Sequence, residues 1–441
     1  MHQFIRLHII SSLLLLIATL AFGLLASWAF LFPETYNQFL PFYQLRPFHV
    51  SAALFWIISG ASACIMHFKN DAFGFTNQSR ALEKLYITTW IGTIIAIFTC
   101  YAMKQFGGRE YWEFPPALCL PLLISWVLLM GSYFLPWFKS AANQPMYVWM
   151  WSTGLLFFLL TFLEQNLWQI PWFRQSYLRE VTIQWKANGS SVGAWNQILY
   201  GTSLYLMVKI SGNENIARGY PAFFFYILGL SNLMFNWGHH VYNLPASSWI
   251  RDTSYLISMT EWVFFIRMVQ GFKNTLDTRR RYRNLITYRY LIASEFWVFL
   301  NLLLALLMSV PAINRYTHGT HFTVAHAMGT TIGINTMILL SGFSYMLGID
   351  NIKDKAKKLI GTQYWICQYS LGVFWFSLIA AGMIKGYMLT FQGNTNFQKV
   401  MLYVSKALTV SSIAGAGLLI SIGTIAVVYI RQAITMVVKE Q

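Results

Sequence analysis

Residues 320–347 read THFTVAHAMGTTIGINTMILLSGFSYML, a stretch without a single Asp, Glu, Lys or Arg. A helix needs about 20 apolar residues to cross the hydrocarbon core of a bilayer, and this stretch is long enough. It nevertheless contains His321 and His326, although polar side chains are costly inside lipid. The stretch therefore predicts a membrane-spanning helix that also carries a functional site.

Apolar runs of the same kind recur along the whole chain. Of its 441 residues, 56% are hydrophobic and 10% are charged, whereas soluble domains carry roughly 25% charged residues. We therefore predict an all-α, polytopic integral membrane protein with about 12 transmembrane helices, folded as a single domain over residues 1–441. The predicted spans lie near residues 9–32, 46–67, 84–103, 115–138, 145–163, 188–210, 219–242, 253–272, 287–310, 320–347, 362–388 and 405–430.

Basic residues outnumber acidic ones, and the formal net charge is +16. They gather at the ends of apolar runs, as in the cluster at residues 279–283, and do not form one hydrophilic region. This distribution is typical of cytoplasmic loops of membrane proteins and argues against nucleic acid as a partner. It predicts that both termini are cytoplasmic and that residues 164–187 form a long external loop.

Histidines accumulate at one depth of the predicted membrane domain. They are His49, His239, His240, His318, His321 and His326, all toward the outer ends of predicted spans. Two carboxylates, Glu261 and Glu295, also fall inside spans. A single histidine is more often a hydrogen-bonded core residue than a ligand. Six at one depth indicate a haem or metal site, because neutral imidazole is a preferred ligand of haem iron, copper and non-haem iron.

Two local patterns refine this prediction. His326 and Met328 are two residues apart, so on a helix they point about 200° apart and could each face a different haem; the plain alternative for Met328 is core packing. His239 and His240 are adjacent, and the flanking Gly238 and Pro245 suggest an opened last helical turn. Such a distortion would help both imidazoles to reach one metal, whereas the alternative is a solvated pair in a loop.

Four motifs together resemble a known family. RPFH at residues 46–49, GGREYWE at 107–113, WGHHVY at 237–242 and YTHGTHFTVAHAM at 316–328 are similar to the catalytic subunit of the haem-copper oxidase superfamily. The nearest branch is the large subunit of the cytochrome bc-type nitric oxide reductases, with the cbb-type oxidases next. The resemblance runs over essentially the whole chain, with the motifs in the same order.

The resemblance implies two b-type haems. His49 would be an axial ligand of the low-spin haem, and Met328 stands where the family has that haem's second histidine. His326 would be the proximal ligand of the high-spin haem, and His318 matches a histidine near the haem edge. Ligation by histidine and methionine would raise the potential of the low-spin haem relative to two histidines.

The resemblance also implies metal sites. His239 and His240 would bind a non-haem iron or copper ion, and Glu261 matches a glutamate near that metal. Glu110 matches a calcium ligand, with Glu113 at a neighbouring acidic position; oxygen ligands suit calcium.

The chain departs from the family at the non-haem metal. The third metal histidine falls on Asn188, and the family's metal-binding glutamate falls on Val192. A second glutamate falls on Asn196. An amide oxygen is a poor ligand for a soft metal, so the metal is weakly held, differently chosen or absent.

The resemblance predicts reduction of nitric oxide to nitrous oxide in the bacterial inner membrane. The sequence has no Cys-x-x-Cys-His motif, so a c-type haem is not attached to this chain. Electrons would come from a haem-c-carrying subunit or a soluble cytochrome. The open alternatives are nitric oxide dismutation, oxygen reduction, a non-catalytic haem protein that binds gas or transfers electrons, and a transporter.

Overall fold

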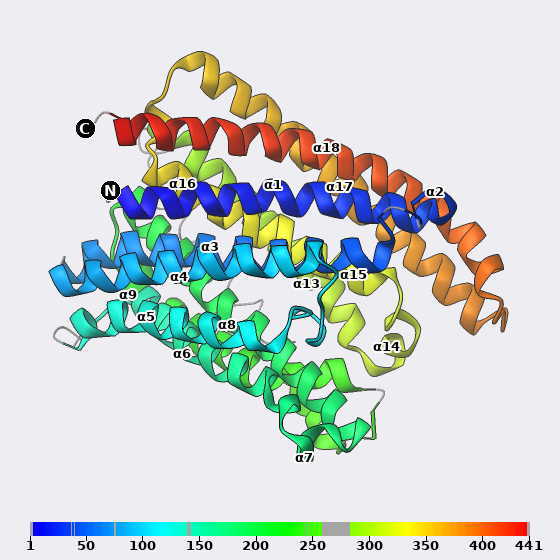
Figure 1. Ribbon diagram of the computed structural model, residues 1–441. Coiled ribbons are helices and arrows are strands. Elements are labelled where there is room, and N and C mark those ends of the chain that lie inside the picture. Colours follow the sequence, from blue (N-terminus) through cyan, green and yellow to red (C-terminus); the bar gives the residue numbers. More distant parts are fainter. Residues whose placement is uncertain are drawn as a thin grey trace. The chain divides into compact units, whose positions relative to one another are not determined.

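A computed structural model describes residues 3–36, 38, 40–74, 76–138, 143–242, 244–245, 247–257 and 283–438. Within these residues the chain forms helices and no strand, apart from one isolated bridge between Arg109 and Trp112. Figure 1 shows this helical architecture. The predicted all-α fold is confirmed.

Nine segments in the described part are long and apolar enough to cross a membrane. They are α1 (Gln3–Leu31), α3 (Phe42–Phe73), α4 (Asn77–Ala102), η1 with α5 (Pro116–Leu118 and Cys119–Trp137), α6 with η2 (Met146–Gln165 and Leu167–Gln169), α13 (Leu285–Ser309), α15 with η4 and α16 (His321–Met328, Gly329–Thr336 and Met337–Met346), α17 (Asp354–Thr390) and α18 (Phe397–Val438). The chain is thus a polytopic membrane protein.

The predicted number of about twelve spans is not reached among the described residues. The sixth predicted span, 188–210, lies within α8 (Tyr177–Ser211), which is helical but comparatively polar. The seventh, 219–242, covers α10 (Tyr220–Phe235), which has only 16 residues, and the 3₁₀-helix that follows it. Most of the eighth, near 253–272, lies outside the described residues. The remaining short helices are α2 (Pro33–Tyr36), α7 (Pro171–Arg174), α9 (Asn215–Arg218), η3 (Asn236–Val241), α14 (Pro311–Thr317) and η5 (Ile349–Asn351).

The predicted external loop at 164–187 is partly wrong, because α8 begins at Tyr177. Polar side chains on its first turns have partners that stabilise the helix beyond the apolar run. Glu180 pairs with Arg109, and Gln184 accepts a hydrogen bond from Gln165 at 2.6 Å. Apolar length alone cannot reveal such contacts, so it underestimates the helix.

Contacts divide the described chain into two compact units. Unit 1 comprises residues 1–8, 58–291 and 338–346, and unit 2 comprises residues 9–57, 292–337 and 347–441. Within unit 1, α6 packs on α8, where Gly154 lies directly against Ile198. Within unit 2, α17 and α18 pack along each other (Figure 1). Small residues let helices approach closely in a membrane, where the hydrophobic effect between helices is weak.

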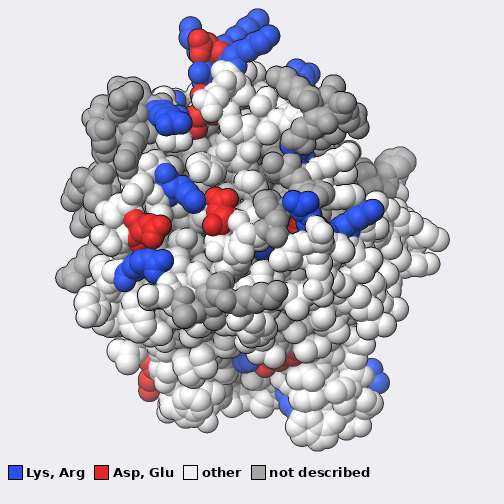
Figure 2. Space-filling view, turned by 90° about the vertical axis from the view of Figure 1, so that its left-hand side faces the viewer, with Lys and Arg blue, Asp and Glu red and all other residues white. Residues whose placement is uncertain are grey.

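The surface is largely uncharged, with many exposed apolar side chains such as Ile95, Leu120 and Ile413. On the face in Figure 2, basic side chains lie among acidic and uncharged ones and do not form one continuous basic area. Apolar side chains on the outside of long helices are what a lipid environment requires.

Candidate functional site

The predicted site residues divide between the two units. Unit 1 contains His239, His240, Asn188, Glu110 and Glu113. Unit 2 contains His49, His318, His326 and Met328. Glu261, the predicted acid near the metal, lies outside the described residues.

The adjacent histidines in unit 1 lie on η3, a 3₁₀-helix that follows α10. Their ring centroids are 4.1 Å apart, and the ring planes meet at 41°. Gly238 allows a close approach, because a Cβ there would lie 2.7 Å from the Ile250 carbonyl oxygen. The predicted departure from α-helical geometry is present, but the turn is tightened into a 3₁₀-helix and not opened.

Helix α8 supports the second of these histidines. The Trp185 ring stacks on His240 with centroids 5.9 Å apart and planes at 15°. One turn further along α8, a Cβ on Gly189 would lie 3.0 Å from His240 Cδ2. Residues four apart share a helix face, so Trp185 and Gly189 together hold His240 in position. Neither Trp185 nor Gly189 was predicted from the sequence. The available signal was their spacing of four residues on the helix that also carries Asn188.

Asn188, which the resemblance predicts to stand in place of the third metal histidine, is on the same helix. It is 3% exposed, and its Oδ1 accepts no hydrogen bond from the residues that the structure describes. Asn188 precedes Gly189 by one residue, so its side chain leaves α8 about 100° away from the direction that faces His240. Asn196 Oδ1, seven residues after Gly189 on the same helix face, is also buried without a partner in the described part of the chain.

The donor set in unit 1 fits a metal with an incomplete protein shell. Two imidazoles in contact can offer nitrogen ligands, and buried amide oxygens without partners are uncommon in proteins. Among the described residues, no three His, Cys, Asp or Glu side chains come together as a complete metal site. The third histidine and the carboxylate that the sequence lacks are therefore not replaced by other residues of this part of the chain.

The GGREYWE motif forms a turn tied to the beginning of α8. Tyr111 has φ 73°, and the Gly107 and Gly108 amides donate to the Glu113 carbonyl oxygen. Arg109 pairs with Glu180 of α8, and its guanidinium lies over the Trp168 ring.

The acidic side chains of that motif differ in exposure. The Glu110 side chain is exposed and the Glu113 side chain is partly buried. The turn therefore presents carboxylate oxygens beside the helix that carries Trp185, and the predicted calcium site at Glu110 and Glu113 stays a prediction.

The backbone of α1 fixes the imidazole of His49 in unit 2. His49 lies on α3, and its Nδ1 is 2.8 Å from the Thr19 carbonyl oxygen. A carbonyl can only accept, so Nδ1 carries the proton and Nε2 keeps a free lone pair. A Cβ at Gly23 would lie 2.7 Å from His49 Cε1, so glycine is needed for the imidazole to lie against α1. This arrangement fits haem ligation.

His326 and Met328 both lie on the regular helix α15, so their predicted divergence by about 200° follows from helix geometry. Asn301 Nδ2 donates to the His326 carbonyl oxygen at 3.0 Å and to Thr330 Oγ1 at 2.8 Å. His326 Nδ1 is buried and makes no hydrogen bond to any described residue. A buried imidazole on a membrane-spanning helix is a candidate for a functional role, because polar side chains are costly there.

The helix changes character directly after Met328. Residues Gly329–Thr336 form a π-helix, a form that is frequent at functional sites. A Cβ at Gly329 would lie 2.3 Å from Asn301 Oδ1, so this position requires glycine. His318, by contrast, is exposed at the end of α14, and its place near a haem edge stays a prediction.

Comparison with protein families gives one match that covers most of the chain. Residues 3–425 match the family described as cytochrome c and quinol oxidase polypeptide I.

Two characterised proteins are similar at low identity. A nitric oxide reductase subunit of Stutzerimonas stutzeri is 20% identical, covering 86% of this chain and 83% of that protein. Cytochrome c oxidase subunit 1 of Rhodobacter capsulatus is 21% identical, covering 80% of this chain and 69% of that protein.

A solved structure shares the fold. A chain of a heme-copper terminal oxidase dimer, determined by cryo-EM, superposes with a TM-score of 0.72 at 13% identity. The match covers 98% of this chain and 83% of that one. At this identity the likeness concerns the fold alone.

Proposed function

Because the chain belongs to the cytochrome c and quinol oxidase polypeptide I family, the catalytic subunits of the haem-copper oxidase superfamily, we propose that it reduces nitric oxide to nitrous oxide. The observation that carries the proposal is the His239–His240 pair, whose rings lie 4.1 Å apart on a distorted helix end. Two adjacent histidines in an apolar protein are costly without a ligand. The similarity to a nitric oxide reductase subunit supports the choice of substrate.

Residues of unit 2 would hold two b-type haems. His49 and Met328 would ligate the low-spin haem, and His326 would ligate the high-spin haem. The bond between His49 Nδ1 and the Thr19 carbonyl fixes the ring and raises the basicity of Nε2. Asn301 holds the backbone of His326 in place.

Residues of unit 1 would hold a non-haem iron or copper ion. His239 and His240 would be its nitrogen ligands, and Asn188 would offer at most one weak oxygen ligand. The haems and this metal, when bound, supply electrons and a place to bind the gas. Trp185 restricts the rotation of His240 and keeps the ligand geometry constant while the gas binds.

The reaction joins two nitric oxide molecules and takes up two electrons and two protons, giving nitrous oxide and water. The protons need a titratable group near the metal, and we assign that role to Glu261. Electrons would arrive from a haem-c-carrying subunit or a soluble cytochrome, since the sequence carries no motif for covalent haem. Calcium at Glu110 and Glu113 would brace the turn that Arg109 ties to α8. The setting would be the bacterial inner membrane, with both termini cytoplasmic.

Three observations favour other functions. Met328 as a haem ligand would make the low-spin haem a better electron acceptor and a poorer donor, which favours nitric oxide dismutation, because that reaction needs no external electrons. The similarity to a cytochrome c oxidase subunit favours oxygen reduction. The incomplete ligand set among the described residues favours a non-catalytic haem protein that binds gas or transfers electrons.

One assay distinguishes these functions. Purified, haem-loaded protein receives nitric oxide under argon, with and without a chemical electron donor, and nitrous oxide, dinitrogen and oxygen are measured by mass spectrometry. We expect nitrous oxide only when the donor is present. Dinitrogen and oxygen without a donor would indicate dismutation. In a parallel sample that receives oxygen in place of nitric oxide, donor-dependent oxygen consumption by protein that forms no nitrous oxide would indicate an oxygen reductase. No turnover despite reduced haem would indicate a non-catalytic role.

A further inference from the structure

A row of polar side chains runs between α3 and α4 in unit 1, and we call it the α3–α4 seam. It consists of Ser59, Ser62 and Lys69 on α3 and of Ser79, Glu83, Tyr86 and Trp90 on α4, all buried. Ser59 and Lys69 are ten residues apart, which corresponds to about 15 Å along a helix. None of these residues belongs to the proposed haem or metal ligands.

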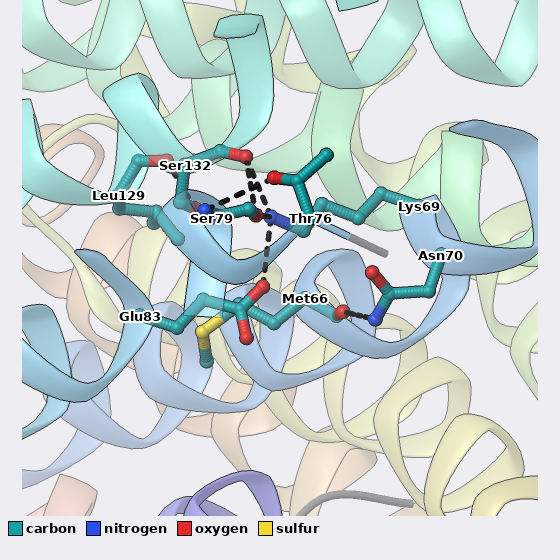
Figure 3. A network of polar contacts seen from close by, with 8 residues as sticks. All are labelled: Met66, Lys69, Asn70, Thr76, Ser79, Glu83, Leu129 and Ser132. Carbon is teal, nitrogen blue, oxygen red and sulfur yellow. Dashed lines mark hydrogen bonds and ion pairs between the residues drawn. The ribbon is translucent and has the colours of Figure 1, made fainter. Parts of the chain in front are cut away.

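One end of the seam is an ion pair inside the protein (Figure 3). Lys69 Nζ lies 2.7 Å from Glu83 Oε1, and the two side chains are 1% and 5% exposed. The same ammonium donates to Ser79 Oγ at 2.7 Å and to the Ser132 carbonyl oxygen at 2.7 Å, and it lies 3.2 Å from Ser132 Oγ. An ammonium has three protons, so its hydrogen-bonding capacity is fully used by α4 and α5.

The hydroxyl groups around Lys69 cannot pass a proton onward. Ser79 Oγ donates its own proton to the Ser132 carbonyl oxygen, and Ser132 Oγ donates to the Leu129 carbonyl oxygen. A hydroxyl has one proton and a carbonyl has none to give. Each path from Lys69 through these hydroxyls therefore ends at a backbone carbonyl.

Beyond the ion pair, the α3–α4 seam continues through Tyr86 and Ser62, whose hydroxyl groups could carry protons if water reached them. Tyr86 donates its hydroxyl proton to Ser62 Oγ at 2.9 Å, and Ser62 donates to the Ser59 carbonyl oxygen at 2.9 Å. His8 Nε2 is also 2.9 Å from Ser62 Oγ. Because Ser62 has already given its only proton to Ser59, Nε2 is the donor in this contact.

Burial of two charges needs a reason. Replacing a buried ion pair by apolar residues of similar size is often neutral or stabilising, because the ions lose their hydration. In a protein that offers apolar alternatives throughout its spans, fold stability alone does not account for Lys69 and Glu83. A fixed positive charge in a low dielectric does, however, repel protons and other cations.

We propose that Lys69 is a fixed positive charge that closes the α3–α4 seam to protons. Glu83, Ser79 and Ser132 hold the ammonium so that it neither moves nor gives up its proton. Without it, these oxygen atoms would hydrogen-bond to water, and water would connect the end of the seam to Tyr86, Ser62 and His8. The protons consumed in turnover would then enter by another route. This last point rests on the proposed function.

The test measures passive proton flux, which does not depend on gas chemistry. The whole protein is reconstituted in liposomes with a pH-sensitive dye inside, and a potassium gradient with valinomycin drives protons inward. Lys69→Met removes the charge and leaves Glu83 to exchange protons, so we expect a roughly tenfold higher flux than in the wild type. Glu83→Gln leaves the ammonium without its counter-ion, so Lys69 loses its proton and the flux rises as well.

Three further variants make the result specific. Lys84→Met removes the exposed lysine next to Glu83 and should leave the flux at the wild-type level. Lys69→Arg keeps the positive charge, so its passive proton flux should stay at the wild-type level. The double variant Lys69→Met/Glu83→Met removes both polar groups and should return the flux toward the wild type. Haem content and thermal unfolding of each variant identify those that have not folded.

The proposal is overturned if folded Lys69→Met and Glu83→Gln proteins both keep the wild-type flux, since the pair would then only connect helices. A raised flux in the double variant Lys69→Met/Glu83→Met would also overturn the proposal, because the space left by the altered side chains, and not the charge, would then control the flux. A fall in turnover-linked proton uptake without a rise in passive flux would make Lys69 a proton carrier instead. Because nitric oxide turnover is read separately, failure of this proposal is distinguishable from failure of the proposed function.

Discussion

The two groups of histidines are held in different ways. In unit 2, His49 bonds through its ring to the Thr19 carbonyl, and the backbone of His326 is held by Asn301. In unit 1, His239 and His240 lie at a 3₁₀ helix end, where Trp185 stacking and contact with Gly189 position the second ring. A hydrogen bond to a ring nitrogen fixes both the tautomer and the orientation of an imidazole, whereas stacking restricts its rotation alone.

Because the two groups are held by different contacts, we expect the proposed haem ligands and the proposed metal ligands to act independently. The proposed haem ligands lie on α-helices, His49 on α3 with 32 residues and His326 on α15 with eight, whereas the proposed metal pair lies on a 3₁₀-helix of six residues. Substitution in one group should therefore leave the other group's cofactor in place. The four predictions below test this independence, beginning with the largest effect.

The largest effect is expected for His326→Ala. It removes the proposed protein ligand of the high-spin haem, so haem content should fall by about half and nitric oxide reduction should disappear. Pyridine haemochrome assays measure the haem per chain. His67→Gln, which changes a histidine outside both groups, should keep the full content. Retention of full haem content by His326→Ala would remove this residue from the ligand set.

The next effect concerns the metal pair. His240→Ala should remove the non-haem metal and reduce nitric oxide turnover by roughly a hundredfold, since a bound metal contributes several kcal/mol to charge stabilisation. Both haems should remain, as measured by absorption spectra and elemental analysis of the same sample. Loss of haem together with the metal would contradict the independence of the two groups.

Two glycine substitutions compare the supports of the rings directly. Gly23→Ala would place a Cβ 2.7 Å from His49 Cε1, and Gly189→Ala would place one 3.0 Å from His240 Cδ2. The first should alter the low-spin haem spectrum and leave the metal in place. The second should weaken metal affinity about tenfold, as loss of ligand support typically does, and leave the haem spectrum unchanged. If Gly23→Ala weakened metal affinity and Gly189→Ala altered the haem spectrum, the contacts assigned to His49 and His240 would be wrong.

The smallest effect is expected for Asn301→Leu. It removes the hydrogen bonds to the His326 carbonyl and to Thr330, which should cost about 1–3 kcal/mol of stability because a buried carbonyl loses its extra partner. Thermal unfolding followed by haem absorbance measures the change. Asn232→Leu, on α10 of unit 1, is the control. At the temperature where Asn301→Leu loses haem absorbance, the control should keep it. Equal destabilisation of haem binding by both would count against a specific role of Asn301.

Much of the fold was predictable from apolar length alone. Residues 320–347 were expected to span the membrane, and His321–Met346 does form one of the candidate spans. The long polar start of α8 was not predictable, because its stability comes from Arg109 and Gln165, far away in the sequence. The predicted span at 219–242 corresponds to α10 and the 3₁₀-helix after it, so the helical part is shorter than the apolar run indicates.

The site was predictable only in part. Gly238 indicated the distorted turn at His239 and His240, because a glycine next to adjacent histidines permits a tight backbone. The contacts of Trp185 and Gly189 with His240, and the Lys69–Glu83 pair, depend on which helices become neighbours. One sequence contains no information on helix neighbours, so these partners emerge only from the structure.

Elemental analysis combined with haem quantification on the purified wild-type protein shows whether His239 and His240 hold a metal in addition to the haems. Iron, copper and calcium per chain are measured together with pyridine haemochrome spectra, so that haem iron can be subtracted from total iron. We expect two b-type haems and one additional iron or copper per chain. Two haems without a further metal would contradict a catalytic role for His239 and His240, and a protein without haem would contradict the whole assignment of ligands.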